Sequence, residues 1–432
     1  MSRLNKENTV LKYGRHLKNL PNTLPPSYTV LRPSFPKAVV NTKEYINRVI
    51  DAPVQSKPFN DIFKKDNKVL IILSDITRYT ASERYLPIII DRLNHTGIDD
   101  KNITLICALG IHKKQTAHEH KKLIGSHLYK RFEVLDHDAF DKKNMVFLGT
   151  TRRGTPIEVN HLLTETDHII LTGSIRFHYF AGFGGGRKSI LPGVSSLNSC
   201  VANHLLVLNP QNQSGRHPLA RTSILKGNPV HEDMSEACNH FKSLFLFNTI
   251  LSPQRELLKV VAGDVHAAFN QGCRFLKNNF SVPITKKADL VIASCGGHPW
   301  DINFIQAHKT LEMATNVLKK GGVMILLAEC SQGSGNPRFL KWFNNESAES
   351  FESNLRTDYE INGQTAYATF LKAKKYHIIL LSSLKEEEVK KMSLLPVSTI
   401  DEALENAYNL LGPSPLTYII PDGNSVLPSL IP

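Results

Sequence analysis

Residues 178–204 contain the side chains of this sequence that are best suited to chemistry. His178 begins a stretch that reads His-Tyr-Phe-Ala-Gly-Phe-Gly-Gly-Gly-Arg-Lys and ends at Lys188, and His204 follows sixteen positions later (204 minus 188). The glycines at 184–186 let a bulky anionic group approach the backbone closely, because no side chains stand in its way. Histidine can give or take a proton near neutral pH and is a common metal ligand. The pattern predicts a cofactor site at this turn.

Two simpler interpretations compete with a cofactor site. Residues 182–189 could form a phosphate-binding loop, but that motif requires glycine immediately before the lysine, and Arg187 occupies this position. The segment could also be a plain glycine-rich turn in which Arg187 and Lys188 are exposed and serve only solubility. At the level of function, the alternative is a non-catalytic nucleotide- or phosphate-binding protein that uses the 182–189 turn.

Short apolar runs rich in β-branched residues recur along the chain and are separated by polar segments of helix length. Several runs are continuous rather than alternating, as in strands that are buried on both faces of a parallel sheet. We therefore predict an α/β fold with two domains, each with a mostly parallel sheet flanked by helices, and an active site in the cleft between them. The predicted strands are 68–74, 102–109, 145–148, 168–172, 289–294, 323–328 and 376–381.

The length of 432 residues exceeds what one hydrophobic core usually serves. A new strand-helix-strand series starts near residue 286, so we expect an N-terminal cofactor-binding domain over 1–285 and a C-terminal domain over 286–413. Residues 414–432 are expected to return to the first domain. Two short apolar pieces, 9–13 and 28–31, suggest a strand pair added to a sheet edge.

Polar side chains follow three of the predicted strands. Asp75 and Arg78 come directly after the run 68–74, His112 follows the run 102–109, and His178 follows the run 168–172. In open α/β sheets, ligands bind where the carboxyl ends of the strands meet the loops. We therefore expect these side chains to line one crevice.

Residues 303–320 form the best-supported helix of the sequence. Apolar residues recur there at steps of three and four, and Gly321-Gly322 supplies a stop signal. Gln306 and Lys309 lie three positions apart on an adjoining face, so both could contact one ligand.

Composition and charge exclude several classes of protein. The formal charge of +13 could indicate a nucleic-acid partner, but the lysines are scattered in short pairs without a basic arm or a recognised binding motif. An anionic small-molecule substrate fits the charge equally well. We find no apolar run long enough for a signal peptide or a membrane span, so we expect no nucleic-acid partner, no membrane association and a cytoplasmic location.

The six cysteines show no Cys-x-x-Cys pair, so most of them are expected to pack as small apolar side chains. His118-Glu-His120 could suggest zinc, but it lacks the His-Glu-x-x-His spacing and is expected on an exposed helix face.

Taken together and in order, these segments resemble the nickel-pincer-nucleotide lactate racemases. The resemblance runs from about residue 60 to 310 and is looser over the last hundred residues. The segments that carry it are 74–78, 108–112, 178–188, 192–193, 203–204, 227–233, 296–301 and Gln306 with Lys309.

The resemblance implies a site for a nickel-containing cofactor, the pyridinium-3-thioamide-5-thiocarboxylate mononucleotide. In this family a lysine carries that nucleotide covalently, and a histidine is the remaining protein ligand of nickel. The implied roles are covalent attachment at Lys188, close backbone approach at Gly184, Gly185 and Gly186, nickel binding at His204, acid/base catalysis at His112 and His178, and substrate binding at Arg78, Lys309, Gln306 and Asp75.

Elementary chemistry agrees with these implied roles. Inversion of a 2-hydroxy acid by hydride transfer needs one base for the hydroxyl proton in each orientation, so two histidines are expected. No amino-acid side chain accepts hydride, so the acceptor must be a cofactor. The planar guanidinium of Arg78 suits a carboxylate, which Lys309 could reinforce as a point charge.

The sequence departs from the family at two positions near the expected substrate. Tyr79 stands where the family usually continues with proline after Arg78, and Ile305 stands where the lactate enzymes tend to have an aromatic residue. We therefore expect a racemase or epimerase that acts on C2 of lactate or of a larger 2-hydroxy acid, with cofactor-synthesis and nickel-insertion proteins as its partners.

Overall fold

The computed structural model describes residues 9–210, 213–360 and 362–431. The chain divides into two compact units. The first unit comprises Phe35–Asn209 and Arg216–Asn278, and the second comprises Met1–Ser34, Pro210–Gly215 and Asn279–Pro432. Both have mixed α/β structure with a sheet that is mostly or wholly parallel, as the apolar runs predicted.

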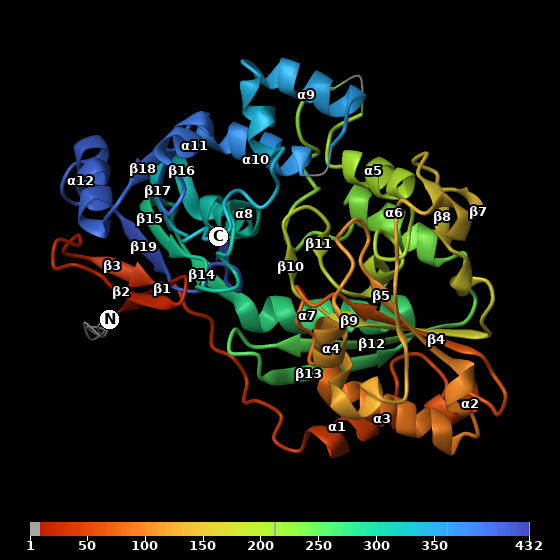
Figure 1. Cartoon of the computed structure of the whole chain (residues 1–432). Coiled ribbons are helices and arrows are strands. Elements are labelled where there is room, and N and C mark those ends of the chain that lie inside the picture. The colour runs from red at the N-terminus through yellow and green to blue at the C-terminus, as the bar shows by residue number, and fades with distance from the viewer. Residues whose placement is uncertain (1–8, 211–212, 361, 432) are drawn as a thin grey trace. The chain divides into compact units, whose positions relative to one another are not determined.

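The main sheet of the first unit has the strand order β13-β12-β9-β4-β5-β6 (Figure 1). All neighbours in it are parallel except β12 and β13. Its strands are β4 (Val69–Ser74), β5 (Ile103–Ala108), β6 (Val134–Asp136), β9 (His168–Ser174), β12 (Leu244–Leu251) and β13 (Leu257–Gly263).

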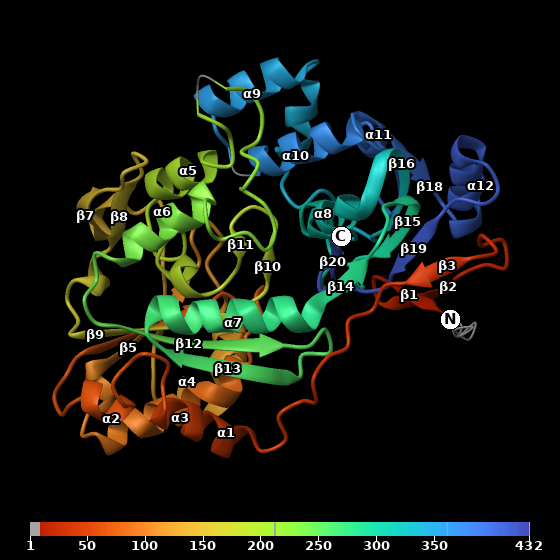
Figure 2. The same cartoon turned by 180° about the vertical axis from the view of Figure 1, so that it is seen from behind.

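Helices cover both faces of this sheet. On one face, alternate residues of β4 such as Val69 and Ile71 join a core with α1, α2, α3 and α4. The helix α7 runs along the other face of β12 and β13, as the views from the front and from behind show (Figures 1 and 2). These helices are α1 (Thr42–Asp51), α2 (Phe59–Ile62), α3 (Ser82–His95), α4 (Ala117–Tyr129) and α7 (Val265–Phe280).

The remaining elements of the first unit lie outside the main sheet and its flanking helices. The predicted strand 145–148 forms there, but it belongs to an antiparallel pair and not to the main sheet. The elements are β7 (Met145–Thr150), β8 (Pro156–Asn160), β10 (Phe177–His178), β11 (Gly182–Phe183), α5 (Leu197–Leu205), α6 (Pro229–Cys238) and the 3₁₀ turns η1 (Asp100–Asn102), η2 (Lys142–Asn144), η3 (His161–Leu163) and η4 (Gly186–Ser189).

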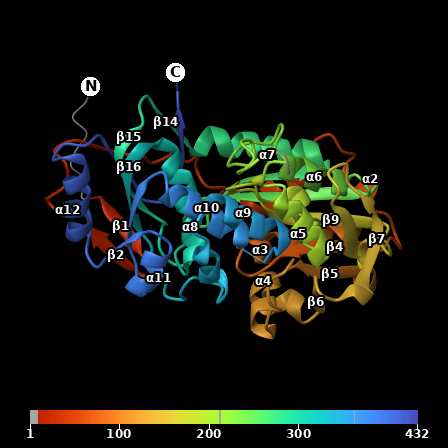
Figure 3. The ribbon, with the colours of Figure 1, turned by 90° about the horizontal axis from the view of Figure 1, so that it is seen from above.

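The second unit contains a fully parallel sheet of order β18-β17-β16-β15-β19-β3. Its strands are β3 (Tyr28–Val30), β15 (Ala288–Ser294), β16 (Leu318–Leu327), β17 (His377–Leu381), β18 (Leu395–Val397) and β19 (Thr417–Ile420). Helix α12 (Ile400–Leu411) packs on one face, and α8 (Phe304–Ala314) and α10 (Gly363–Ala373) lie on the other (Figures 1 and 3). The other elements are β1 (Val10–Tyr13), β2 (His16–Asn19), β14 (Ser281–Ile284), β20 (Leu427–Leu430), α9 (Ala348–Thr357), α11 (Glu386–Lys391), η5 (Thr315–Val317) and η6 (Phe339–Asn344).

Both ends of the chain belong to a different unit from the one that we expected. Among the described residues, 9–34 and 414–431 belong to the second unit, whereas we expected both segments in the first. The physical reason is strand pairing, because β3 pairs with β19 and β19 pairs with β15 in one sheet. The piece 28–31 does add a strand to a sheet edge, but the piece 9–13 pairs with β2 instead.

The predicted helix 303–320 is shorter than expected. Helix α8 ends at Ala314, a 3₁₀ turn follows, and Leu318 already belongs to β16, where it pairs with Ala288. Leu318 is buried as the helical pattern required, but its burial comes from the sheet.

Two further features of the chain concern membrane-spanning helices and cysteines. Within the described residues, no helix has both the length and the apolar character needed to cross a membrane. All six cysteines are buried as free thiols, in agreement with their predicted packing.

Candidate active site

The buried carboxylate of Asp75 organises the loop that follows β4. Its Oδ2 accepts hydrogen bonds from Nη1 of Arg78 at 2.5 Å and from Nδ1 of His112 at 3.2 Å. Its Oδ1 accepts from the backbone and hydroxyl of Thr77. Burial by itself would raise the pKa of Asp75, but Arg78, His112 and Thr77 together hold that pKa well below its ordinary value. Asp75 is therefore ionised and orients both the predicted carboxylate-binding arginine and a predicted catalytic histidine.

His112 is held in a defined tautomer. A carboxylate can only accept, so the Nδ1 atom of His112 carries the proton that bonds to Asp75, and the neutral ring has its lone pair on Nε2. This Nε2 lies 3.5 Å from Nη2 of Arg78. The loop that carries His112 is also tied to the turn beyond Lys188, because the Gly110 amide donates to the Gly193 carbonyl at 2.8 Å.

The glycine-rich turn is built around the side chain of Arg187. Arg187 is only 2% exposed, so the alternative interpretation, in which Arg187 is exposed and serves only solubility, is wrong. It donates to the carbonyls of Ala181, Phe183 and Gly185 and lies 4.4 Å from the centre of the Phe269 ring. Carbonyl dipoles and an aromatic face thus stabilise this buried positive charge.

The backbone amides of this turn bond within the protein. The Gly186 amide donates to Oδ1 of Asn248 at 2.8 Å, and the Gly184 amide donates to the Arg176 carbonyl at 2.8 Å. A phosphate-binding loop directs such amides at its ligand. This arrangement counts against the simple phosphate-loop interpretation of residues 182–189.

Phe180 is the point where three predicted site residues meet. Its ring centre lies 4.5 Å from that of His178 and 5.1 Å from that of His204, and Nζ of Lys188 lies 5.7 Å from it. We did not predict a role for Phe180 from the sequence. Its place between His178 and the glycines was the available signal, but an aromatic residue in such a turn also suits an ordinary core.

His204 has the chemical state that metal binding requires. Its Nδ1 donates to the Cys200 carbonyl at 2.6 Å, which leaves the lone pair on Nε2. Burial, and to a smaller extent the positive charge of Lys188, lowers the pKa of His204 to about 3. The imidazole is therefore neutral, and its outer hydrogen bond orients it as in metal-binding histidines.

The segment 227–233 holds Phe180 and the helix that carries His204 in position through hydrogen bonds. As predicted, it is a turn that enters a helix: Asn228 caps α6, and its amide donates to the Phe180 carbonyl at 2.8 Å. Within α6, the buried Asp233 accepts from the side chain of Asn203, which precedes His204, at 2.8 Å. The segment thus positions Phe180 and α5 and needs no catalytic role.

His178 is held in the opposite tautomer to His112. Its Nδ1 accepts from the Ala181 amide at 3.2 Å, so the neutral ring carries its proton on Nε2. One histidine therefore presents a lone pair at Nε2, and the other presents an N–H at Nε2.

The Asp75 and Phe180 clusters interact electrostatically. The charge of Arg78 is among the causes that lower the pKa of His204. Arg176, whose role we did not predict from the sequence, donates to the Tyr79 carbonyl at 2.7 Å. Burial, and to a smaller extent the charge of Arg78, lowers the pKa of Arg176 to about 10. The structure thus brings together the site residues predicted in the first unit, at the carboxyl end of the main sheet.

Gln306 and Lys309 lie in the second unit, on the helix α8. Asn303 caps this helix, and Nζ of Lys309 donates to Oε1 of Gln306 at 2.5 Å. The two side chains therefore contact each other on one face of α8. Their contact with a substrate that Arg78 also binds stays a prediction.

The expectation for His118 and His120 needs correction. His118 is exposed as expected, but the side chain of His120 is only 14% exposed and donates from Nε2 to Asp136 at 2.8 Å. The helix α4 begins with a capping box at Thr116, and His120, one turn further along, bonds to Asp136 at the end of β6.

Family models match both parts of the chain. The lactate racemase N-terminal domain matches residues 13–215, and the lactate racemase C-terminal domain matches residues 284–428. A lactate racemase of Thermoanaerobacterium thermosaccharolyticum is 31% identical over 397 residues, which are 90% of this chain and 91% of that protein. A lactate racemase of Lactiplantibacillus plantarum is 31% identical over 398 residues, with the same shares of both chains.

Solved structures agree. The lactate racemase apoprotein from T. thermosaccharolyticum has a TM-score of 0.88 at 29% identity and covers 98% of this chain and 100% of its own. A Thermotoga maritima protein shares the fold, with a TM-score of 0.67 at 20% identity over 90% of this chain and 98% of its own. This chain, with its two matched domains and its gathered lysine and histidines, belongs to the lactate racemase family and is an isomerase.

Proposed function

We propose that this racemase inverts C2 of a 2-hydroxy acid by proton-coupled hydride transfer, through a transient 2-keto acid, with a nickel-pincer nucleotide attached to Lys188. The observation that carries the proposal is the arrangement around Phe180. One half-buried lysine amine, one histidine in its metal-binding form and a second histidine all contact the same ring.

Lys188 would hold the nucleotide covalently, the glycines at 184–186 would let it approach the backbone, and Nε2 of His204 would bind the nickel. The donor set fits, since a neutral imidazole is a suitable ligand for nickel. When bound, the group supplies the electron-pair acceptor that no side chain can provide. The chain depends on cofactor-synthesis and nickel-insertion proteins for this group, and we place it in the cytoplasm with them.

Arg78 binds the substrate carboxylate in this proposal. Its guanidinium is about half exposed and is steadied through Nη1 by Asp75, so part of its donor fork can face an anion. Gln306 and Lys309 would bind the substrate from the second unit, where their mutual hydrogen bond keeps the ammonium in place.

The two histidines have different roles in proton transfer in this proposal. Nε2 of His112 accepts the hydroxyl proton, and the Asp75 carboxylate then stabilises the imidazolium that forms. His178 presents an N–H at Nε2 that can hydrogen-bond the substrate oxygen in the other orientation. To act as base or acid for that orientation, His178 must exchange the Ala181 hydrogen bond for a proton on Nδ1, because a neutral imidazole does not give up its one proton.

The residues next to Arg78 are where the substrate preference of this chain can differ from that of the lactate enzymes, so the proposed substrate is lactate or a larger 2-hydroxy acid. Tyr79 replaces the family's usual proline, its hydroxyl donates to Glu83 at 2.6 Å, and Arg255 lies 5.0 Å from its ring. These residues change the lining next to the carboxylate and not the reacting groups. Substrate size is therefore the property in which this chain can depart from its relatives.

Peptide mass spectrometry combined with racemisation assays tests the proposal. Protein produced together with cofactor-synthesis enzymes should show a nucleotide adduct on the Lys188 peptide and should racemise members of a panel of 2-hydroxy acids. Lys188→Ala should remove both adduct and activity, while Lys226→Ala, which changes an exposed lysine of the same unit, should keep them. Full activity of unmodified, nickel-free protein would overturn the proposal.

A further inference from the structure

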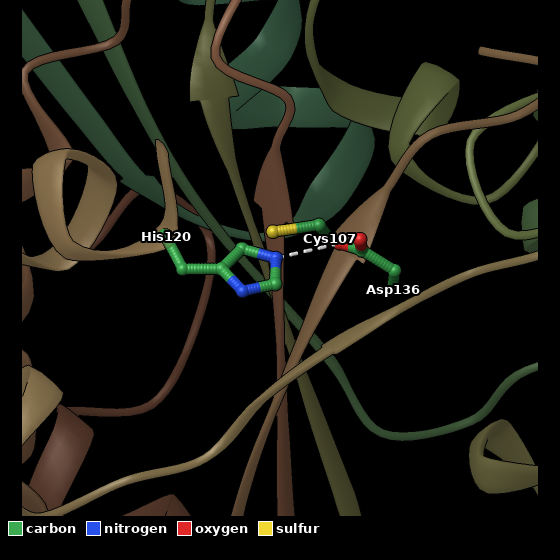
Figure 4. Close-up of side chains that lie close together, drawn as sticks. All are labelled: Cys107, His120 and Asp136. Carbon is green, nitrogen blue, oxygen red and sulfur yellow. Dashed lines mark hydrogen bonds and ion pairs between the residues drawn. The ribbon is translucent and has the colours of Figure 1, made fainter. Parts of the chain in front are cut away.

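A second group of metal-binding side chains lies outside the proposed active site. Cys107 at the end of β5, His120 on α4 and Asp136 at the end of β6 point toward one another (Figure 4). Their Sγ, imidazole nitrogen and carboxylate oxygen all lie within 4.8 Å of one another. Three elements that are distant in sequence thus deliver three different donor types to one place.

The three side chains are largely shielded from solvent. Cys107 is fully buried, and the side chains of His120 and Asp136 are 14% and 8% exposed. Burial, and to a smaller extent the negative charge of Asp136, raises the pKa of the Cys107 thiol.

We propose that Cys107 Sγ, His120 Nε2 and a carboxylate oxygen of Asp136 bind one divalent ion of the zinc class. Thiolate, imidazole and carboxylate are the donors that Zn²⁺ takes in proteins, and Co²⁺ and Ni²⁺ accept the same set. Three protein donors leave the fourth position of a tetrahedral ion for water.

The geometry requires only small side-chain movements. Ordinary zinc bond lengths place neighbouring donor atoms roughly 3.3–3.6 Å apart in a tetrahedron. The present separations reach at most 4.8 Å, so shifts of about 1 Å in flexible side chains bring the donors together.

The charges also balance. On binding, the Cys107 thiol releases one proton to solvent, and the neutral His120 ring moves its proton from Nε2 to Nδ1. The ion replaces the hydrogen bond that His120 now donates to Asp136. Thiolate, carboxylate and a divalent ion then sum to zero net charge, which suits a buried site.

The site has a structural connection to the catalytic loops. Asp136 accepts from the Gln115 amide at 2.7 Å, and Oε1 of Gln115 accepts from the amide of Ile76, next to Asp75, at 2.7 Å. An ion on Asp136 would therefore steady the segment between β5 and α4, which carries His112. This inference does not rest on the Lys188 cofactor, because none of its three ligands belongs to the proposed active site.

Cobalt absorption spectroscopy tests the proposal on the full chain, produced without cofactor-synthesis enzymes and stripped of metal with a chelator. Co²⁺ should bind at one ion per chain and give thiolate-to-metal charge-transfer absorption, which Zn²⁺ should displace. Cys107→Ser should abolish this absorption, and Asp136→Asn and His120→Gln should weaken binding at least about tenfold. Zn²⁺ should also slow hydrogen exchange at the amides of Ile76 and Gln115.

Matched controls separate this site from other thiols and histidines. Cys273→Ser changes another buried thiol of the same unit, and His118→Gln changes the exposed histidine of the same helix, so both should bind Co²⁺ like the parent. Circular dichroism checks that each variant is folded. Absence of charge-transfer absorption in the folded parent would overturn the proposal. So would absorption that survives Cys107→Ser and disappears in Cys200→Ser, beside His204.

Discussion

Asp75 shows how one buried side chain can set the properties of a site. Its two oxygens accept from Arg78, His112 and Thr77, so one negative charge orients an anion-binding group and a base at once. A neutral amide in its place would keep some hydrogen bonds and lose the charge that holds Arg78 and His112.

The pH dependence of stability follows from the lowered pKa of Asp75. A carboxyl group with a lowered folded-state pKa stabilises the protein above its ordinary pKa of about 4, and this contribution is lost as pH falls further. Asp75→Asn should therefore reduce the free energy of unfolding by about 1–2 kcal/mol near neutral pH, discounted because Arg78 and His112 are partly exposed. Urea titrations should show this difference shrinking below about pH 4. A difference that is constant down to pH 2 would contradict the prediction.

Phe180 should matter more for activity than for stability. Phe180→Leu keeps an apolar core but removes the ring that Lys188, His178 and His204 contact, so we expect at least about tenfold slower racemisation by cofactor-loaded protein. Phe183→Leu is the matched control, since Phe183 is equally buried and its ring packs on Phe177. Each variant should lose less than about 1.5 kcal/mol of stability. Equal activities of the two variants would argue against a positioning role for Phe180.

At the scale of elements, the turn 182–188 depends on backbone that only glycine tolerates. Gly182 has a φ of +76°, and a Cβ there would lie 2.1 Å from the carbonyl oxygen of Ile224. Gly154 has a similar φ of +85° but open space around it. We predict that Gly154→Ala costs about 1 kcal/mol of stability, whereas Gly182→Ala costs at least about 3 kcal/mol. Thermal unfolding would measure both, and equal costs would show that the close approach to Ile224 is easily relieved.

Much of the element structure was predictable because continuous apolar runs have few alternatives. The runs at 68–74, 102–109 and 168–172 became β4, β5 and β9, and the polar residues after them meet at one edge of the sheet. The end of α8 was not predictable from periodicity. Leu318 fits the helical pattern but pairs with Ala288 in the sheet, and a long-range partner of this kind leaves no local signal.

The inward turn of His120 escaped prediction for the same reason. Its partner Asp136 lies sixteen positions away on another element, and Cys107 lies thirteen positions before it. Local spacing therefore offered only the exposed pair His118 and His120. The missed roles of Phe180 and Arg187 also depend on tertiary contacts, namely rings and carbonyls that the fold brings together.

At the scale of the whole molecule, the chain supplies predicted substrate-binding groups from both units, Arg78 from the first and Lys309 from the second. If both bind one carboxylate, Lys309→Ala should raise KM about tenfold, the effect of one charge-assisted hydrogen bond, with a smaller change in kcat. Lys320→Ala, which removes an exposed lysine of the same unit, is the control. Steady-state racemisation kinetics give the comparison. An unchanged KM in Lys309→Ala would remove Lys309 from the substrate site.

The division of the whole chain was harder to predict than its fold class. Two mostly parallel sheets follow from the apolar runs, but the assignment of both chain ends to the second unit follows from pairing of β3 with β19, two short strands almost 400 residues apart. Likewise, the scattered lysine pairs give the chain its positive charge but do not identify what it binds.

In the proposed reaction, the hydrogen on C2 moves as hydride to an acceptor held by Lys188, while His112 and His178 transfer only the proton on oxygen. Racemisation of lactate deuterated at C2, in ordinary water and with cofactor-loaded protein, tests it most directly. We predict that the inverted product retains deuterium at C2, because the hydride is returned without contact with solvent. Loss of deuterium to water at the rate of racemisation would show proton abstraction at carbon and would contradict the account.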